Sequence, residues 1–211
     1  GVLPARAAGV KRIVLATPAK GGVVAPLTLV AARECGVHEI YKMGGAQAVA
    51  ALAYGTQSVK KVDVIAGPGN IYVTLAKKEV YGEVGIDMLA GPSEIMIVAD
   101  ESADPAYVAA DMLSQAEHDV LARAIVVTTS RALAERTAEE TERQLARLPR
   151  REVAERSLAA SGGIIVADTL EQACELVNEV APEHLELYVR DPRSLLPRIT
   201  SAGAVFLGGY T

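Results

Sequence analysis

The sequence contains few cysteines and no long apolar segment. Its two cysteines, Cys35 and Cys174, are too few and too isolated for a disulfide framework or an all-cysteine zinc site. We interpret them as buried thiols of a cytoplasmic protein. No segment approaches the roughly 18 consecutive apolar residues that a membrane helix needs. The first residues show neither the basic stretch nor the cleavage site of a targeting signal.

Clusters of basic residues are absent as well. The 211 residues include 21 Lys and Arg against 26 Asp and Glu, a net charge of -5. Nothing here would neutralise a phosphodiester backbone or an anionic membrane, so we expect neither nucleic acid nor membrane as a partner. The charged stretch from Arg131 to Arg156 alternates in sign at helical spacing, which is typical of a solvated helix face. We therefore expect a small-molecule ligand.

Short apolar runs alternate with alanine-rich helical stretches along the chain. The runs are nearly continuous and rich in β-branched residues, the pattern of parallel strands that helices cover on both faces. The predicted strands are Arg12 to Thr17, Glu39 to Met43, Val62 to Ala66, Ile95 to Ala99, Ala124 to Thr129, Gly163 to Ala167 and Ala204 to Leu207. The predicted helices are Pro26 to Cys35, Ala46 to Tyr54, Ile71 to Val80, Pro105 to His118, Arg131 to Leu148 and Leu170 to Val180. This alternation predicts an α/β fold of doubly wound, mainly parallel sheets.

The rhythm of strands and helices is interrupted between Tyr81 and Pro92. Glycines gather there, and Gly91-Pro92 ends the interruption. We place the boundary between two lobes at this point. The first lobe is predicted to comprise residues 1–91 and the second lobe residues 92–211.

A glycine-rich motif follows the third predicted strand. Doubly wound sheets bind ligands at the carboxyl ends of their strands, where Gly67-Pro68-Gly69-Asn70 leads into the helix at Ile71. Glycines allow close approach of the backbone, and a helix N-terminus offers free N–H groups to a phosphate or dinucleotide. The G-x-G-x-x-G fingerprint is absent, however, and a tight turn with Asn70 as the N-cap explains the motif equally well.

Two further glycine motifs are weaker signals. Met43-Gly44-Gly45-Ala46-Gln47 follows the second predicted strand, and Gly91-Pro92-Ser93-Glu94 precedes the fourth. Taken alone, both are typical of turns, and Ser93 is more typical of a residue that caps or hydrogen-bonds a loop.

The helix that ends near His118 carries a polar stripe beside its apolar face. Asp111, Gln115 and His118 form this stripe at about 100° per residue, and the last two lie one turn apart. They could converge on one ion or ligand. Two ligands do not complete a metal shell, and a helix C-terminus favours a histidine in any case, so a structural role stays open.

The second histidine of interest lies after a proline. Pro182 ends the helix that precedes it, which predicts that Glu183 and His184 are adjacent on a loop. The imidazole titrates near neutral pH and a carboxylate can activate water, a pairing suited to acid–base catalysis. A surface glutamate and a partly buried structural histidine explain the same residues as well.

Taken together and in order, these motifs resemble the central part of histidinol dehydrogenase. The resemblance covers essentially all 211 residues. It rests on Met43-Gly44-Gly45-Ala46-Gln47-Ala48, Val62-Asp63-Val64-Ile65-Ala66-Gly67-Pro68-Gly69-Asn70, Ile86-Asp87-Met88-Leu89-Ala90-Gly91-Pro92-Ser93-Glu94, Leu113-Ser114-Gln115-Ala116-Glu117-His118-Asp119 and Asn178-Glu179-Val180-Ala181-Pro182-Glu183-His184-Leu185-Glu186. The last block is highly specific for the family.

The resemblance implies an enzyme with two incomplete Rossmann-like lobes. Such enzymes oxidise L-histidinol to L-histidine through L-histidinaldehyde, with two NAD and one zinc ion per subunit, in the last steps of histidine biosynthesis. It also implies roles for individual residues, and the roles divide the lobes into an NAD-contacting first lobe and a second lobe with the zinc and catalytic residues. By resemblance, Gln47 and Asn70 contact NAD, Gln115 and His118 bind zinc, Ser93, Gln115, His118 and His184 contact substrate, His184 is the catalytic base, and Glu183 activates water.

The departure from the family is one of length, because its chains are roughly twice as long. The resemblance assigns a tyrosine-containing NAD segment to the region before Gly1. It assigns an aspartate zinc ligand to the region after Thr211, and a further glutamate and a histidine zinc ligand to the partner subunit of an intertwined homodimer. We therefore expect these 211 residues alone to bind zinc weakly and to turn over poorly. A non-catalytic α/β nucleotide-binding module and a related amino-alcohol dehydrogenase remain the alternatives.

Overall fold

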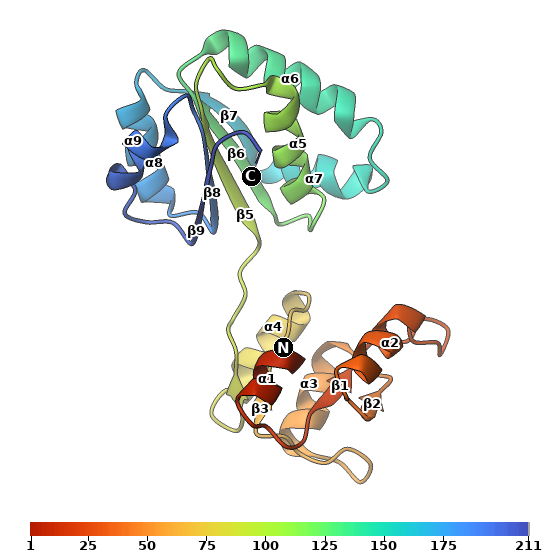
Figure 1. The fold of residues 1–211 in the computed structure, drawn as a ribbon. Helices are drawn as coiled ribbons and strands as arrows, with labels where there is room; N and C mark the ends of the chain where they lie inside the picture. The colour runs from red at the N-terminus through yellow and green to blue at the C-terminus, as the bar shows by residue number, and fades with distance from the viewer. Residues whose placement is uncertain (211) are drawn as a thin grey trace. The chain divides into compact units, whose positions relative to one another are not determined.

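The computed structural model describes residues 1–210 of the chain. It divides after Gly91 into two compact units, which we call the first unit (residues 1–91) and the second unit (residues 92–211). In Figure 1 the first unit runs from red to yellow and the second from green to blue. Among the helices of residues 1–210, none combines the length and apolar character needed to cross a membrane.

The first unit contains two small parallel sheets and four helices. Its strands are β1 (Val14–Ala16), β2 (Glu39–Tyr41), β3 (Val64–Ile65) and β4 (Gly85–Ile86), and β1 pairs with β2 as β3 pairs with β4. Its helices are α1 (Val2–Ala7), α2 (Pro26–Glu34), α3 (Gly45–Tyr54) and α4 (Ile71–Val80). The core of the unit includes Val49 and Ala53 of α3 with Val80 at the end of α4.

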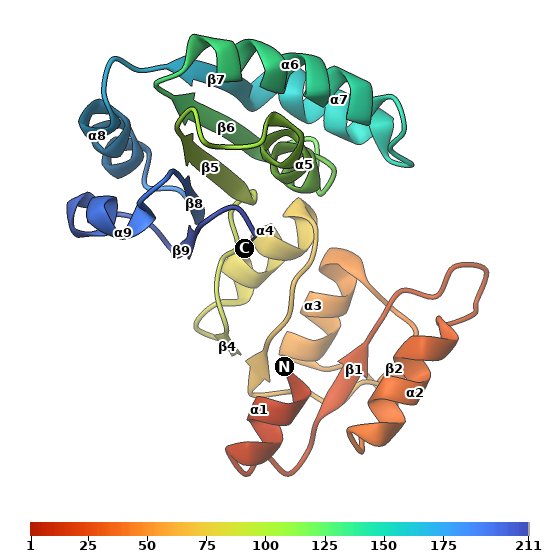
Figure 2. The same cartoon turned by 45° about the horizontal axis from the view of Figure 1, so that its top comes forward.

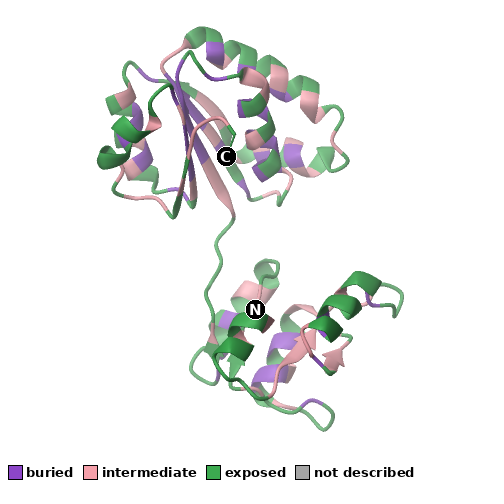
Figure 3. Cartoon of the chain, viewed as in Figure 1, coloured by how far each residue is buried: buried purple, intermediate pink, exposed green. Residues whose placement is uncertain are grey.

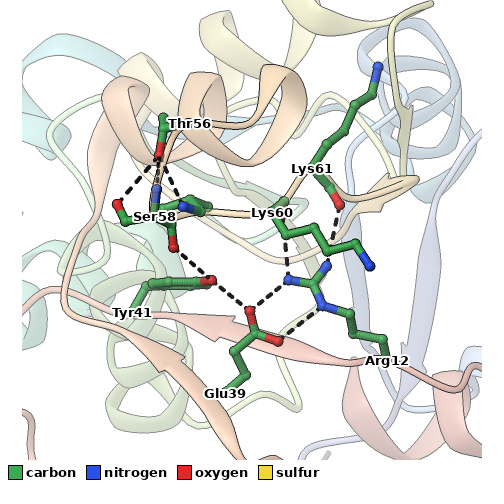
Figure 4. Close-up of polar contacts among 8 residues, drawn as sticks. Arg12, Glu39, Tyr41, Thr56, Ser58, Lys60 and Lys61 are labelled. Carbon is green, nitrogen blue, oxygen red and sulfur yellow. Dashed lines mark hydrogen bonds and ion pairs between the residues drawn. The ribbon is translucent and has the colours of Figure 1, made fainter.

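A hydrogen-bonded network ties β1 and β2 to the loop that follows α3 (Figure 4). Arg12 donates through Nε to Glu39 Oε2 at 3.0 Å and through its terminal nitrogens to the carbonyls of Lys60 and Lys61. Tyr41 donates its hydroxyl to the same glutamate at 2.6 Å. The hydrogen bonds from Arg12 and Tyr41 lower the pKa of Glu39, so this carboxylate stays charged and holds the two strands in register.

The second unit is a five-stranded parallel sheet with helices on both faces. Its strands are β5 (Glu94–Ala99), β6 (Arg123–Thr128), β7 (Gly162–Val166), β8 (His184–Tyr188) and β9 (Ala204–Leu207), in the order β7-β6-β5-β8-β9. Its helices are α5 (Pro105–Ala116), α6 (Arg131–Leu145), α7 (Arg151–Ser161), α8 (Leu170–Val180) and α9 (Pro192–Leu195), followed by a 3₁₀ turn at Leu196–Arg198. Figures 1 and 2 show α5, α6 and α7 on one face and α8 and α9 on the other.

Alternate residues of the central strands face these two layers, as the period of two in a strand requires. Ile97 of β5 packs with Val108 and Met112 of α5. On the opposite face, Leu185 of β8 packs with Val177 of α8. Figure 3 shows the result, with the central strands buried and the outer sides of the helices exposed.

The predicted fold class is confirmed. All paired strands of residues 1–210 run parallel. In the five-stranded sheet the strand order reverses between β5 and β8, as in a doubly wound fold. Helices α4 and α8 have the predicted bounds because Asn70 and Thr169 cap them. The Asn70 side chain accepts from Val73 N at 3.2 Å, and that of Thr169 accepts from Gln172 N at 3.1 Å.

Several predicted elements were wrong or missing. The helix predicted to run to Leu148 ends at Leu145, and a turn at Pro149 separates it from α7, which the prediction lacked. Helices α1 and α9 and the two-residue strand β4 were also missed, because each is too short to show a period. These are local errors that leave the layer architecture unchanged.

The most consequential error concerns His184, because we predicted that both Glu183 and His184 lie on a loop and only Glu183 does. His184 instead opens strand β8. The left-handed conformation of Ala181 (φ 52°) turns the chain after α8, and only Pro182 and Glu183 intervene before the strand. The His-Leu-Glu-Leu-Tyr sequence alternates polar and apolar residues, which is the period of a strand.

Candidate functional site

The predicted site residues of the second unit gather at the edge of the sheet where its strands begin. Ser93 precedes β5 and Glu183 precedes β8, and the strands pair so that His184 lies opposite Ile95. Helix α5 runs back from the carboxyl end of β5, so its last turn returns Gln115 to the starting edge, with His118 just beyond. We call this set the amino-edge cluster: Ser93, Gln115, His118, Glu183 and His184.

This location differs from the edge that the fold class favours. We expected ligand sites at the carboxyl ends of the strands. In the second unit, the ends of β5 and β8 are tied together there by the buried Asp100. Its carboxylate accepts the N–H groups of Ser102 and Arg190, each at 2.9 Å. These hydrogen bonds already occupy the Asp100 carboxylate and the two N–H groups. The same groups are therefore not available to a ligand between β5 and β8, where the strand order reverses.

The ring of His184 is oriented by the neighbouring strand. Nδ1 lies 3.1 Å from the carbonyl oxygen of Glu94, so it carries the proton and donates it. The other ring nitrogen, Nε2, is then free to accept a proton. The ring also lies beside Phe206 of β9, with centroids 6.0 Å apart, and its side chain is 34% exposed.

Glu183 lies on the same side of the chain as His184. Its Oε2 is 3.9 Å from His184 Nδ1, and its side chain is 53% exposed. The backbone of Glu183 is fixed by Ala204, whose N–H donates to the Glu183 carbonyl at 2.8 Å. A Cβ atom on Gly203 would lie 2.6 Å from that carbonyl, so only glycine fits there.

Gln115 is a mostly buried residue whose side-chain amide makes no hydrogen bond to the described part of the chain. The residue is 7% exposed. The amide atoms are not among the buried polar atoms that lack a partner, so they reach solvent and are open to a ligand. His118 is exposed, its backbone N–H bonds the Gln115 carbonyl at 3.1 Å, and its carbonyl accepts from Arg150 at 3.2 Å.

A pair of buried carboxyl groups lies between α5 and β8. Glu186 is 4% exposed. It lies two residues after His184 in β8, so the two side chains are on the same face of the sheet. Burial, together with the charge and hydrogen bond of Asp111, raises the pKa of Glu186 to about 8. Burial raises the pKa of Asp111 too. The two carboxyl groups therefore share a proton near neutral pH.

Sequence reasoning found only half of this pair. Asp111 was placed on the polar stripe with Gln115 but received no role, and Glu186 was missed. The sequence feature that could have revealed Glu186 is a polar residue at an inward position of a strand. Leu185 and Leu187, on either side of it, are both fully buried. The strand itself had to be recognised first.

The first unit contains a pocket of about 400 Å³ at the ends of its strands. Its lining includes the Gly67-to-Asn70 motif, Gly44, Gly45 and Lys77. Asn70 lines the pocket and also caps α4, so both sequence interpretations of that residue apply. Gln47 is exposed and does not line the pocket, but its side chain lies close to Gly45, which does.

No group of three or more His, Cys, Asp or Glu side chains in the described part of the chain is arranged to hold a metal ion. Gln115 and His118 supply two donors, one carboxamide oxygen and one imidazole nitrogen. Two donors are half of a tetrahedral zinc shell. Gln115 and His118 alone would therefore leave a tetrahedral zinc site incomplete.

Comparison with known proteins identifies the family. The sequence profile of histidinol dehydrogenase matches residues 1–211. Histidinol dehydrogenase of Moorella thermoacetica is 63% identical over 210 residues, 99% of this chain and 50% of that protein, and the Bacillus subtilis enzyme is 58% identical over 211 residues, 100% of this chain and 49% of that protein. The chain thus spans about half the length of the curated relatives it matches.

Solved structures agree with this result. The crystal structure of histidinol dehydrogenase from Elizabethkingia anophelis superposes with a TM-score of 0.93 at 44% identity, covering 100% of this chain and 49% of that one. A propionaldehyde dehydrogenase mutant from Clostridium phytofermentans, at 14% identity and a TM-score of 0.51, covers 85% of this chain and 54% of its own and shares the fold alone. The family profile, the relatives and the solved structure all match this chain over essentially its whole length. The chain therefore belongs to the histidinol dehydrogenase family.

Proposed function

We propose that this chain is the core of an enzyme that oxidises L-histidinol to L-histidine through L-histidinaldehyde, with two NAD and one zinc ion per subunit. Family membership supports the overall reaction. The observation that carries the assignment to this chain is the amino-edge cluster, where an oriented histidine, a carboxylate and the side-chain amide of the mostly buried Gln115 lie along one edge.

His184 is the proposed base. Because its Nδ1–H is held by the Glu94 carbonyl, Nε2 is the nitrogen that accepts the alcohol proton as hydride leaves the carbinol carbon. The fixed ring keeps this lone pair in one direction through both oxidation steps. In the first step the alcohol loses a proton to His184 and a hydride to NAD, which leaves the aldehyde.

Glu183 is the proposed activator of water. Its half-exposed carboxylate can take a proton from a water molecule that adds to the aldehyde carbon, which gives the hydrate needed for the second oxidation. The hydrate then loses a proton and a hydride as the alcohol did. His184 and Glu183 are neighbours in the chain, so one short segment would serve both the alcohol and the aldehyde.

The donor set fits a zinc ion in part. Gln115 would offer a carboxamide oxygen that makes no hydrogen bond to the described part of the chain, and His118 would offer an exposed imidazole. When bound, zinc would polarise and orient the substrate imidazole and amine. We propose that Ser93, Gln115, His118 and His184 contact the substrate, and the resemblance assigns the remaining zinc ligands to residues outside this sequence, including the partner subunit of a homodimer.

The pocket of the first unit is the proposed NAD site. Its glycine-rich wall and the N-terminus of α4 suit a pyrophosphate. Asn70 in the wall and Gln47, whose side chain lies close to the lining residue Gly45, are the proposed contacts. Bound NAD would accept the hydride in each step. The two isolated thiols fit a cytoplasmic location, which we also propose.

A full-length protein that contains this chain provides the test. With L-histidinol, NAD and zinc, we expect about two NADH per histidine formed, the ratio of two successive hydride transfers. His184→Asn should abolish most of this activity, and His38→Asn, an exposed histidine of the first unit, is the matched control. NAD binding without turnover would indicate a non-catalytic module. Faster turnover of another amino alcohol would indicate a different substrate.

A further inference from the structure

Both backbone polar groups of Gly67 are held by one ion pair. The Gly67 N–H donates to Asp87 Oδ2 at 2.8 Å, and Lys77 Nζ donates to the Gly67 carbonyl at 3.2 Å. Lys77 and Asp87 also form an ion pair with each other. We call this arrangement the Gly67 clamp, defined by Gly67, Lys77 and Asp87.

The clamp joins three elements of the first unit. Lys77 lies in the last turns of α4, Asp87 directly follows β4, and Gly67 begins the loop after β3. Asp87 is itself fixed, because its N–H donates to the Ile65 carbonyl at 3.3 Å. The loop is therefore attached to the end of a helix and the end of a strand.

The ion pair is buried on the lysine side. The Lys77 side chain is 4% exposed and that of Asp87 is 33% exposed. Partial burial raises the pKa of Asp87, but the hydrogen bonds from Lys77, Gly67 and Met88 outweigh it and lower the pKa to about 2. Asp87 is therefore charged throughout the physiological range, and a buried lysine requires such a partner.

The loop depends on the clamp because glycine can adopt many backbone conformations at similar cost. Gly67 has φ of 136°, a region that only glycine adopts readily. Glycine is also flexible, so nothing intrinsic keeps it there. At the other end of the loop, the side chain of Val73 closely approaches Gly69, and Asn70 caps α4. The segment between these points faces the pocket.

We propose that Lys77 and Asp87 are positioning residues for NAD, because the Gly67 clamp holds the loop from Gly67 to Asn70 in the conformation that binds the dinucleotide. This inference rests on the proposed NAD site. The role is indirect, since the clamp acts on the backbone of the loop. Lys77 itself lines the pocket, so its removal affects one wall directly.

The test uses full-length enzyme with Lys77→Met and Asp87→Asn. The matched control is Lys78→Met, which removes an exposed lysine from the same helical turn. For each protein we would measure NAD affinity by calorimetry without substrate, KM for NAD and for histidinol, kcat, and amide hydrogen exchange of the loop.

We expect Lys77→Met to raise the NAD dissociation constant and KM at least about tenfold, since small misplacements of binding groups have effects of this size. The KM for histidinol should stay within about twofold, and exchange of the loop amides should become faster. Asp87→Asn should act in the same direction but less, because its amide oxygen can still accept the Gly67 N–H. Asp87→Asn preserves side-chain volume, so it carries the test if Lys77→Met does not fold.

Two results would overturn the inference. One is a folded variant with wild-type NAD affinity and loop exchange, and the other is an equal loss for both substrates and kcat. Failure of the proposed function would look different, because wild-type enzyme itself would then bind no NAD. Lys78→Met should match wild type in every measurement.

Discussion

The imidazole Nδ1 of His184 lies 3.1 Å from the carbonyl oxygen of Glu94, on the strand beside it. A carbonyl can only accept, so the contact selects the tautomer with hydrogen on Nδ1. The sheet itself therefore determines which nitrogen is basic. In the proposed reaction, Nε2 of His184 is therefore the atom that accepts the proton of the alcohol.

The split between His184 and Glu183 can be measured in full-length enzyme. His184→Asn should slow oxidation of histidinol by about 10²–10⁴-fold, the usual range for loss of a general base. Glu183→Gln should mainly slow oxidation of histidinaldehyde. Steady-state rates with each substrate would show this, and Glu179→Gln on the exposed side of α8 is the control. Equal losses on both substrates for both variants would argue against separate roles.

Gln115→Leu should separate zinc binding from stability. Leucine replaces a side chain whose amide makes no hydrogen bond within residues 1–210, so the zinc-free protein should melt at about the same temperature. Zinc affinity of the full-length enzyme should fall about tenfold or more. The control is Gln144→Leu, because that amide donates to the Ala106 carbonyl at 2.8 Å and its loss should lower stability without affecting zinc. A zinc affinity unchanged in Gln115→Leu would remove Gln115 from the proposed ligands.

The Glu186 and Asp111 pair predicts a pH dependence of stability. The pKa of Glu186 is raised to about 8, from about 4.3 in an unfolded chain. Between these values the folded protein retains a proton that the unfolded chain has lost, so the free energy of unfolding falls as pH rises. One such proton gives a slope of at most about 1.4 kcal/mol per pH unit.

Denaturant unfolding from pH 5 to 8.5 would measure this slope. The side chain introduced by Glu186→Gln does not titrate, so the free energy of unfolding of this variant should depend less on pH. As pH rises, that free energy should increase relative to the wild type. Glu135→Gln, an exposed carboxylate of α6, is the control. Parallel curves for wild type and Glu186→Gln would contradict the shared proton.

Asp100 should contribute to stability at neutral pH but not at low pH. Burial raises its pKa, but the N–H groups of Arg190 and Ser102 outweigh burial and lower it. Its stabilisation is therefore present above the unfolded pKa of about 3.9 and disappears as pH falls through the folded value. Asp100→Ala should cost about 2–3 kcal/mol at pH 7, because two partly buried N–H groups lose hydrogen bonds to a charged acceptor. A loss that stays the same down to pH 2 would disprove the charged interaction.

The 211-residue chain should bind zinc weakly by itself. Gln115 and His118 supply two donors, and a tetrahedral site needs four. Titration calorimetry should therefore give a zinc affinity at least about a hundredfold below that of the full-length enzyme. Tight binding by these 211 residues would show that other side chains complete the shell.

Much of the fold was predictable because its signals are local. Asn70 and Thr169 mark helix starts by their capping side chains, and the apolar run at β5 indicates a buried strand without reference to its neighbours. By contrast, β4 has two residues and forms only because β3 lies beside it. No period can reveal a strand of that length.

The candidate site was predictable in its residues but not in its geometry. Motifs pointed to Gln115, Glu183 and His184, whereas the edge of the sheet on which they meet depends on the pairing of β5 with β8. Glu186 was missed for the same reason, since its burial follows from strand β8, which the sequence interpretation did not predict. The Gly67 clamp joins residues 10 positions apart or more, and only the folded chain brings them together.

The close approach of Gly203 to the Glu183 carbonyl sets a rule for redesign of this chain. Strand β9 can enter the sheet beside the proposed catalytic segment because residue 203 has no side chain. Even a methyl group there would push the backbone of Glu183 away from its present position. A library that varies the residues around the site should therefore leave position 203 as glycine, although this residue neither binds nor reacts.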